Sequence, residues 1–345
     1  MKTSEKTLLL SKWIDEARTV CTVCHTRPDG DAIGSSVAAY TYLAACRHKN
    51  VTLLLPDAQP KSIDFLLEGI TPKVADASPL AGCDLLICLD FNNFSRVESI
   101  SGACSSFKGR KVLIDHHEAP DESLFDLCFS TTEVSSTCEL LFGILMQMPD
   151  IAGNASLLPP RAAYALMAGM TTDTNNFANS VYPGTLTMAS ALLQAGADRQ
   201  DILDNLYSSG REQRLRALGD ILGNRLIITP EGAAITVLPK TIQDGYGLLD
   251  GETEGFVNIP LEIKHVRLSI FARQEEEGVF RVSIRSKRGT SARRLASTVF
   301  HGGGHEQAAG GKIFIPQDVP DASGAEAYVC SVTARFLQEQ DAPSK

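Results

Sequence analysis

The 345-residue chain has few aromatic residues, no excess of positive charge and no long apolar run near its start, and each absence argues against a class of protein. Aromatic residues make up 6% of the chain, which is little for a protein that stacks the bases of a long single strand. The net charge of −9 argues against coating long nucleic acid by charge alone. Leu8–Leu10 is soon followed by Lys12, Asp15 and Glu16, before a signal peptide or membrane span reaches its usual length. We therefore expect a cytoplasmic protein without membrane association.

Cysteines are present, but their pattern does not suggest disulfides. There are nine of them, an odd number, and they are scattered along the chain. Cys21 and Cys24 have the spacing of a chelating pair, yet residues three apart on a strand point to opposite faces. We therefore expect both thiols to pack in the core.

The first half of the chain alternates short β-forming runs with segments that are apolar at helical spacing. The predicted strands are residues 19–24, 51–55, 84–89 and 111–114. The predicted helices are residues 33–48, 136–148 and a segment that begins after Pro159–Pro160. This alternation predicts an α/β fold with a doubly wound parallel sheet.

The second half begins with consecutive helices and then becomes richer in strands. Helices are predicted at residues 186–195, 201–207 and 212–222. Later strands are predicted at 225–229, 234–238, 266–272, 279–286 and 312–315, with a hairpin through 274–278 and helices at 291–300 and 325–338. We therefore predict a catalytic domain at 1–206, a helical connector at 207–224 and a second, smaller α/β domain at 225–345.

Histidines and aspartates follow several of the predicted elements of the first domain. They are His25, Asp29, Asp31, Asp90, His116 and Asp173. Because parallel sheets bind ligands at the carboxyl ends of their strands, we expect these side chains to meet. Each aspartate alone could be a turn or helix-capping residue. Together, crowded carboxylates and imidazoles without thiolates favour Mn²⁺ or a similar ion over structural zinc, in a pair of ions that share one carboxylate.

These motifs resemble those of the DHH phosphoesterase superfamily. The resemblance rests on His25-x-x-x-Asp29-x-Asp31, Asp90, Asp115-His116-His117 and Asp173-Thr174. In the second domain, Arg285-Ser286 and Gly302-Gly303-Gly304-His305-x-x-Ala308-Ala309-Gly310 are similar to the signature of the DHHA1 domain. The length and the run 254–258 look most like the NrnA type, which comprises oligoribonucleases that also act as pAp phosphatases. The resemblance implies two α/β domains with the active site in the cleft between them.

The same resemblance implies a role for each motif residue. His25, Asp29 and Asp90 would hold one Mn²⁺, and Asp90 would be shared with a second Mn²⁺ held by Asp31, His116 and Asp173. Asp115 would orient a histidine, and His117 would face the substrate phosphate.

In the second domain, the resemblance implies a site for the other phosphate of the substrate. Arg285, Ser286 and His305 would bind it, and the amides of Gly302, Gly303 and Gly304 would form an anion-binding nest. The basic run between Arg281 and Arg294 lies near this loop in the sequence. After Asp173-Thr174 the chain has Asn175-Asn176, where many relatives have a glycine, so the local loop shape differs from the family pattern.

The implied activity is hydrolysis of phosphoesters by metal-bound hydroxide. The substrates would be very short RNA or DNA oligonucleotides, cut to mononucleotides, and pAp, converted to AMP. An alternative is a phosphodiesterase for cyclic dinucleotides or linear products such as pApA. A nucleotide-binding protein without catalysis is an alternative of another class, but the complete ligand set argues against it. A homodimer is compatible with the sequence.

Overall fold

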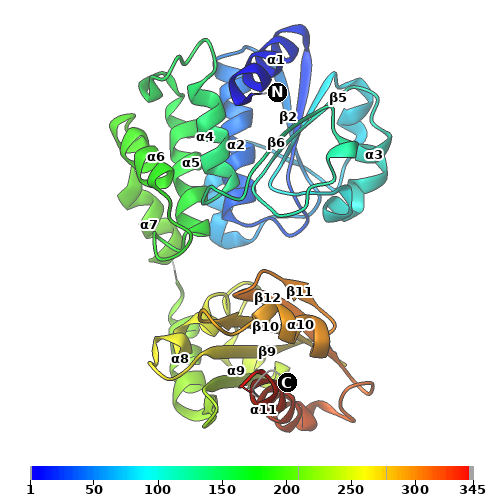
Figure 1. Ribbon diagram of the computed structural model, residues 1–345, viewed down its shortest axis with the longest axis vertical. Helices are drawn as coiled ribbons and strands as arrows, with labels where there is room; N and C mark the ends of the chain where they lie inside the picture. Colours follow the sequence, from blue (N-terminus) through cyan, green and yellow to red (C-terminus); the bar gives the residue numbers. More distant parts are fainter. Residues whose placement is uncertain (1, 209, 277, 342–345) are drawn as a thin grey trace. The chain divides into compact units, whose positions relative to one another are not determined.

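The computed structural model describes residues 2–208, 210–276 and 278–341. The chain divides into two compact units, residues 1–209 and 210–345 (Figure 1). The stretch predicted as a connector, residues 207–224, contains helix α8 (Glu212–Asp220) and most of a π-helical turn (Ile221–Arg225), and both elements fall within the second unit. Ile221 is buried there in a small apolar cluster.

The first unit is built on a six-stranded parallel sheet. Its strands lie in the order β3-β2-β1-β4-β5-β6, and every neighbouring pair is parallel. They are β1 (Thr19–Val23), β2 (Asn50–Leu55), β3 (Lys73–Val74), β4 (Leu85–Leu89), β5 (Arg110–Asp115) and β6 (Leu127–Ser130). The order reverses at β1, so the predicted doubly wound sheet is confirmed.

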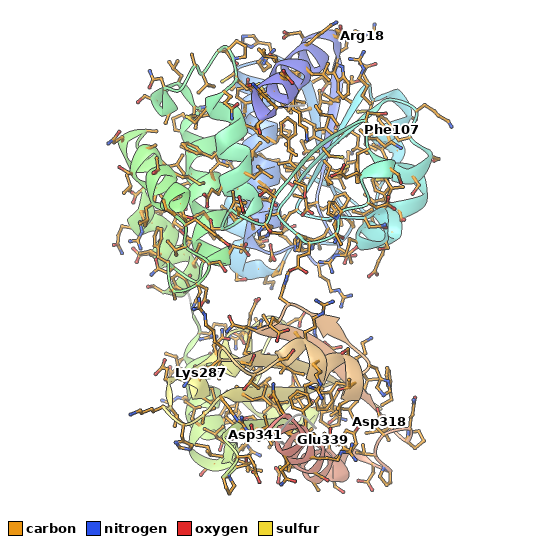
Figure 2. All side chains as sticks on the ribbon, in the orientation of Figure 1. Arg18, Phe107, Lys287, Asp318, Glu339 and Asp341 are labelled. Atoms are coloured by element: carbon orange, nitrogen blue, oxygen red, sulfur yellow. The ribbon has the colours of Figure 1, made fainter. Side chains whose placement is uncertain are left out.

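Helices cover both faces of this sheet, because its strands are apolar on both faces. The helices are α1 (Thr3–Glu16), α2 (Gly30–Ala45), α3 (Ser101–Ser106), α4 (Thr137–Met146), α5 (Pro160–Asp173), α6 (Pro183–Gln194) and α7 (Arg199–Tyr207). The larger core lies under α1, α2, α4 and α5, and the smaller one lies on the α3 side (Figure 1). Phe107, labelled beside α3 in Figure 2, belongs to the smaller core.

Cys21 in β1 and Cys24 just after it pack as expected. Cys21 lies in the smaller core and Cys24 in the larger one, so the two thiols pack on opposite sides of the sheet. All nine cysteines fall within the described residues, and all are free.

Helices α2 and α5 approach each other closely through glycine. A Cβ atom at Gly34 would lie 2.7 Å from the carbonyl oxygen of Ala165 in α5. A Cβ atom at Gly169 would lie 2.4 Å from Cys138 Sγ and 3.1 Å from the carbonyl oxygen of Gly30. Side chains larger than hydrogen at these two positions would therefore push the helices apart.

The second unit contains a mixed six-stranded sheet in the order β11-β12-β10-β9-β8-β7. Its strands are β7 (Ile227–Ile228), β8 (Ala233–Leu238), β9 (Leu268–Glu276), β10 (Val279–Ser286), β11 (Gly303–Gly304) and β12 (Ala308–Phe314). Its remaining helices are α9 (Lys240–Tyr246), α10 (Ala292–Val299) and α11 (Ala325–Asp341). Strands β9 and β10 pair antiparallel, which confirms the predicted hairpin, although Glu277 in its turn lies outside the described residues.

Across the described ranges, we find no helix with the length and apolar character needed to cross a membrane.

Candidate metal centre

The polar motif residues of the first unit come together at the carboxyl ends of its strands. His25 lies two residues beyond β1, Asp90 directly follows β4, and Asp115 is the last residue of β5. Asp29 caps the N-terminus of α2 and accepts hydrogen bonds from two backbone amides in its first turn. Asp173 is the last residue of α5. The alternation of the sequence thus brings five segments to one edge of the sheet.

One group of ligand atoms is formed by His25, Asp29 and Asp90. His25 Nε2 lies 3.8 Å from Asp29 Oδ2 and 3.5 Å from Asp90 Oδ2. The other ring nitrogen, Nδ1, lies 2.9 Å from the carbonyl oxygen of Thr26. Because a carbonyl only accepts, Nδ1 carries a proton in this contact, and Nε2 is the ring nitrogen that could bind a metal ion after losing its own proton.

A second group is formed by Asp31, His116 and Asp173. His116 Nε2 lies 4.0 Å from Asp31 Oδ2 and 3.4 Å from Asp173 Oδ2. It also lies 3.6 Å from Oδ1 of Asp90. The two carboxylate oxygens of Asp90 therefore face different groups, Oδ2 toward His25 and Oδ1 toward His116.

These spacings fit a pair of divalent cations. Imidazole and carboxylate atoms that bind one ion at about 2.0–2.2 Å lie roughly 3–3.6 Å apart, close to the spacings between neighbouring ligand atoms here. The donors are imidazole nitrogens and carboxylate oxygens without thiolate, a set that suits Mn²⁺ and related ions. Asp90 could serve both ions, one with each oxygen.

Burial and mutual repulsion perturb the carboxyl groups. Asp31 is 1% exposed and Asp90 is 2% exposed. Burial, and then the nearby negative charges, raise the pKa values of Asp31 and Asp173 well above their usual range. Burial would also raise the pKa of Asp90, but the hydrogen bond from His25 and the neighbouring histidines lower it below its usual range. Cations at this site would replace the protons that the metal-free carboxyl groups retain.

The histidines are perturbed in different directions. Burial alone would lower the pKa of His25, but its interaction with Asp90 raises it to about 9. Burial lowers the pKa of His116, which favours the neutral form that binds metal. For His117, burial lowers the pKa, but the hydrogen bond with Asp115 and the negative charges of Asp90 and Asp115 together raise it above its usual value. This last contact joins His117 Nδ1 to Asp115 Oδ1 over 2.7 Å. Asp115 thus orients His117.

The predicted residues of the second unit lie on β10 and the β11–β12 hairpin. Arg285 is partly buried, burial lowers its pKa, and its Nη1 donates a hydrogen bond to the carbonyl of Ile284. The hydroxyl of Ser286 is buried and donates to the carbonyl of Thr290 over 2.6 Å. His305 is exposed in the turn between the two strands of the hairpin. The hydroxyl proton of Ser286 is therefore already engaged within the second unit.

The glycine run has a packing role that its sequence did not reveal. The amide of Gly302 donates to the carbonyl of Ala296, so this amide does not contribute to the expected anion-binding nest. A Cβ atom at Gly302 would lie 1.9 Å from the carbonyl oxygen of Gly310, and Gly304 has a φ of +141°. Glycine is therefore needed at both positions to form the hairpin.

Sequence reasoning missed one residue of the site, Thr137. Its hydroxyl donates to Asp90 Oδ1 over 2.9 Å, and its amide donates to Asp31 Oδ2 over 2.7 Å. The sequence signal here, Ser136 three residues before Glu139, indicates only the start of a helix.

Comparisons with known proteins agree with this arrangement. The DHH family, N-terminal domain, matches residues 19–170, and the DHHA1 domain matches residues 234–326. The chain belongs to the DHH family. Members of this family are metal-dependent phosphoesterases, and this chain is one of them.

Individual curated proteins and solved structures are also similar to the chain. A probable bifunctional oligoribonuclease and PAP phosphatase NrnA of Streptococcus mutans is 27% identical over 322 residues, which cover 91% of each protein. The bifunctional oligoribonuclease and PAP phosphatase NrnA of Thermus thermophilus is 28% identical over 84% of this chain and 82% of its own length. An exopolyphosphatase-related protein from Bacteroides fragilis has a similar structure, with a TM-score of 0.88, 32% identity and coverage of 97% of this chain and 96% of its own. The exonuclease RecJ bound to manganese shares the fold at 16% identity, with a TM-score of 0.55 and coverage of 99% and 95%.

Proposed function

We propose that this DHH phosphoesterase uses two Mn²⁺ ions to degrade very short oligonucleotides to mononucleotides and to convert pAp to AMP. The observation that carries the proposal is the division of Asp90 between two ligand groups, with Oδ2 3.5 Å from His25 Nε2 and Oδ1 3.6 Å from His116 Nε2. The names of the relatives from S. mutans and T. thermophilus support the substrate class. The manganese in the RecJ structure supports the choice of ion.

The residues of the first unit would divide the chemistry among them. His25, Asp29 and Asp90 would hold one ion, and Asp31, His116 and Asp173 would hold the other together with Asp90, whose Oδ1 lies 3.6 Å from His116 Nε2. When bound, such a pair of divalent ions supplies an activated water and neutralises the charge on the reacting phosphate. His117, held by Asp115 and with a raised pKa, would donate a hydrogen bond to a phosphate oxygen.

The second unit would select the substrate. Arg285 and His305 would bind the phosphate that does not react, through charge-assisted hydrogen bonds. Long strands should bind weakly, because part of the basic run is already paired within the unit. Arg281, at the start of this run, forms an ion pair with Glu275 over 3.4 Å. With a net charge of −9, the chain would gain little affinity from counterion release along a long backbone.

The experiment compares substrates of different length and shape. The purified chain with Mn²⁺ is given pAp, pApA, cyclic di-AMP and an RNA strand of about twenty nucleotides, long enough to fill the binding groove of a protein that stacks the bases of a strand. We expect rapid release of AMP from pAp and pApA, and a kcat/KM for the long strand at least about tenfold lower, since few of its phosphates would find partners.

Three other results of this experiment would contradict the proposal and favour a different activity. Equal kcat/KM for pApA and the long strand would overturn the proposal in favour of a processive exonuclease. Faster hydrolysis of cyclic di-AMP than of pApA would favour the cyclic dinucleotide phosphodiesterase. Binding of nucleotide without hydrolysis in the presence of Mn²⁺, Mg²⁺ or Co²⁺ would indicate a nucleotide-binding protein.

A further inference from the structure

The first turn of helix α4 touches two of the proposed metal ligands although it supplies none itself. The hydroxyl of Thr137 donates to Asp90 Oδ1 over 2.9 Å. The amides of Thr137 and Cys138 donate to the two carboxylate oxygens of Asp31, over 2.7 Å and 2.9 Å. Thr137 is fully buried, and Asp31 and Asp90 are only 1% and 2% exposed.

We propose that Thr137 is a positioning residue, whose hydroxyl fixes the rotation of the Asp90 carboxylate so that each oxygen faces a different metal ion. The inference rests on the proposed function in one respect, namely that Asp90 is shared by two cations. It goes beyond that function because it assigns the geometry of the shared ligand to a residue that binds neither metal nor substrate.

The rotation of Asp90 needs such a restraint. A carboxylate that is free to turn about its Cβ–Cγ bond has a broad range of orientations, because torsions of this type lack sharp minima. The hydroxyl of Thr137 reaches Oδ1, the oxygen that lies 3.6 Å from His116 Nε2. With Oδ1 held there, Oδ2 points toward His25. Restraint in the metal-free protein would lower the entropic cost of forming the site.

Hydrogen bonds and packing around Ser136 and Glu139 fix the start of helix α4, which carries Thr137. Ser136 caps α4 by accepting a hydrogen bond from the amide of Glu139. The buried carboxylate of Glu139 accepts from the amide and hydroxyl of Ser135 and from the hydroxyl of Thr185. A Cβ atom at Gly184 would lie 2.5 Å from Glu139 Oε1, so α6 also packs against this carboxylate. The segment that presents Thr137 is therefore fixed on both sides.

The test separates the hydroxyl from the rest of the side chain. Thr137→Val removes the donor and keeps the shape, whereas Thr137→Ser keeps the donor and removes a methyl group. In both variants the backbone amide still reaches Asp31. Thr7→Val is the matched control, because Thr7 is equally buried in α1 and its hydroxyl also donates one hydrogen bond. Metal is removed from each protein, and Mn²⁺ binding is then measured by titration calorimetry and by electron paramagnetic resonance of the free ion.

We expect Thr137→Val to weaken the binding of at least one Mn²⁺ by about 10- to 100-fold, the usual cost of losing a partner that orients a metal ligand. Thr137→Ser and Thr7→Val should bind Mn²⁺ within about threefold of the unsubstituted chain, since neither loses the hydrogen bond to Asp90. At saturating Mn²⁺ the KM for pApA should be unchanged in Thr137→Val, because Thr137 does not contact substrate. If circular dichroism shows that Thr137→Val is unfolded, Thr137→Ala takes its place.

Three results would overturn the inference. They are unchanged Mn²⁺ affinity in Thr137→Val, equal impairment of Thr137→Ser and Thr137→Val, and the absence of Mn²⁺ binding by the unsubstituted chain. Failure of the proposed function looks different. In that case the unsubstituted chain binds two Mn²⁺ ions and hydrolyses neither pAp nor pApA, while the difference between the two Thr137 variants persists in the binding data.

Discussion

Replacing Asp90 by asparagine tests the metal centre most directly. The substitution keeps the size of the side chain and removes its negative charge. It should not strain the backbone, because Asp90 has a φ of +65° and asparagine tolerates this left-handed region as well as aspartate does. The variant should therefore fold, and any loss of activity should come from the site.

The size of the effect follows from the contacts of Asp90. Its two oxygens face separate ligand groups, so the charge would act on two cations. Losing a charge-assisted interaction on each side, at about 1.5–3 kcal/mol apiece, gives a total of roughly 3–6 kcal/mol. This corresponds to a loss of about 10²- to 10⁴-fold in kcat/KM or in Mn²⁺ affinity.

The assay compares Asp90→Asn with the same substitution at the other end of the same strand. Asp84 directly precedes β4 and accepts hydrogen bonds from the amides of Arg18 and Thr19, over 2.8 Å and 3.0 Å. Figure 2 labels Arg18 on the first unit. Asp84→Asn should lower the free energy of unfolding without changing Mn²⁺ binding. Both variants are titrated with Mn²⁺ by calorimetry and then assayed on pApA.

One outcome would refute the reasoning. If Asp90→Asn has a normal circular dichroism spectrum and retains Mn²⁺-dependent hydrolysis at the unsubstituted rate, Asp90 does not join two ions.

Two further predictions concern the second unit and the dependence on pH. Arg285→Ala and His305→Ala should each raise the KM for pAp by about 10- to 150-fold, the equivalent of a charge-assisted hydrogen bond of roughly 1.5–3 kcal/mol, and leave Mn²⁺ content unchanged. Depleted Mn²⁺ in His305→Ala, measured by elemental analysis, would contradict this assignment. In the metal-free protein the pKa of His25 is raised to about 9, so its contribution to stability is complete below the unfolded pKa of about 6.5 and is lost as the pH rises through 9. Urea unfolding should show a decrease of roughly 3 kcal/mol across that window, and His25→Gln should remove most of it. If the free energy of unfolding of His25→Gln falls by the same amount over this pH range, the pH dependence comes from other groups.

Periodicity and turn residues predicted most of the fold, and the errors have physical causes. Strand β10 has the predicted bounds, because its apolar and polar residues alternate and glycine precedes it. Strand β3 was missed because Lys73–Val74 is too short to show a period. Strand β11 was missed because Gly303–Gly304 has no side chains from which a period could be read. Both β3 and β11 are defined by pairing with a neighbouring strand, and the local sequence does not encode that pairing.

The proposed metal ligands could be brought together from the sequence because each is a chemically distinctive residue at or near the end of an element. The role of Thr137 could not be predicted, because threonine is common near the start of a helix and its partner Asp90 lies 47 positions away in the sequence. The role of Gly302 was misjudged for a related reason. A glycine beside other glycines suggests an open anion nest, whereas the nearby Gly310 carbonyl requires it for packing.

The departure at Asn175-Asn176 now has a physical explanation. Both residues have positive φ angles, +45° and +56°. Glycine adopts this conformation most readily, and asparagine is among the residues that tolerate it best. The side chain of Asn176 also accepts a hydrogen bond from Arg199 over 2.6 Å, an interaction that glycine could not make. The loop after Asp173 therefore keeps its turn without glycine.

The close approach of α2 and α5 has a consequence for which ion the centre accepts. Asp31 lies in the first turn of α2, and Asp173 is the last residue of α5. The distance between these ligands therefore depends on the helix spacing that Gly34 and Gly169 permit. Mg²⁺ is bound at about 2.0–2.1 Å and Ca²⁺ at about 2.3–2.6 Å, so a change of a few tenths of an ångström discriminates between ions of equal charge. A methyl group added at the helix interface would thus alter ion selectivity although every proposed ligand remained in the sequence.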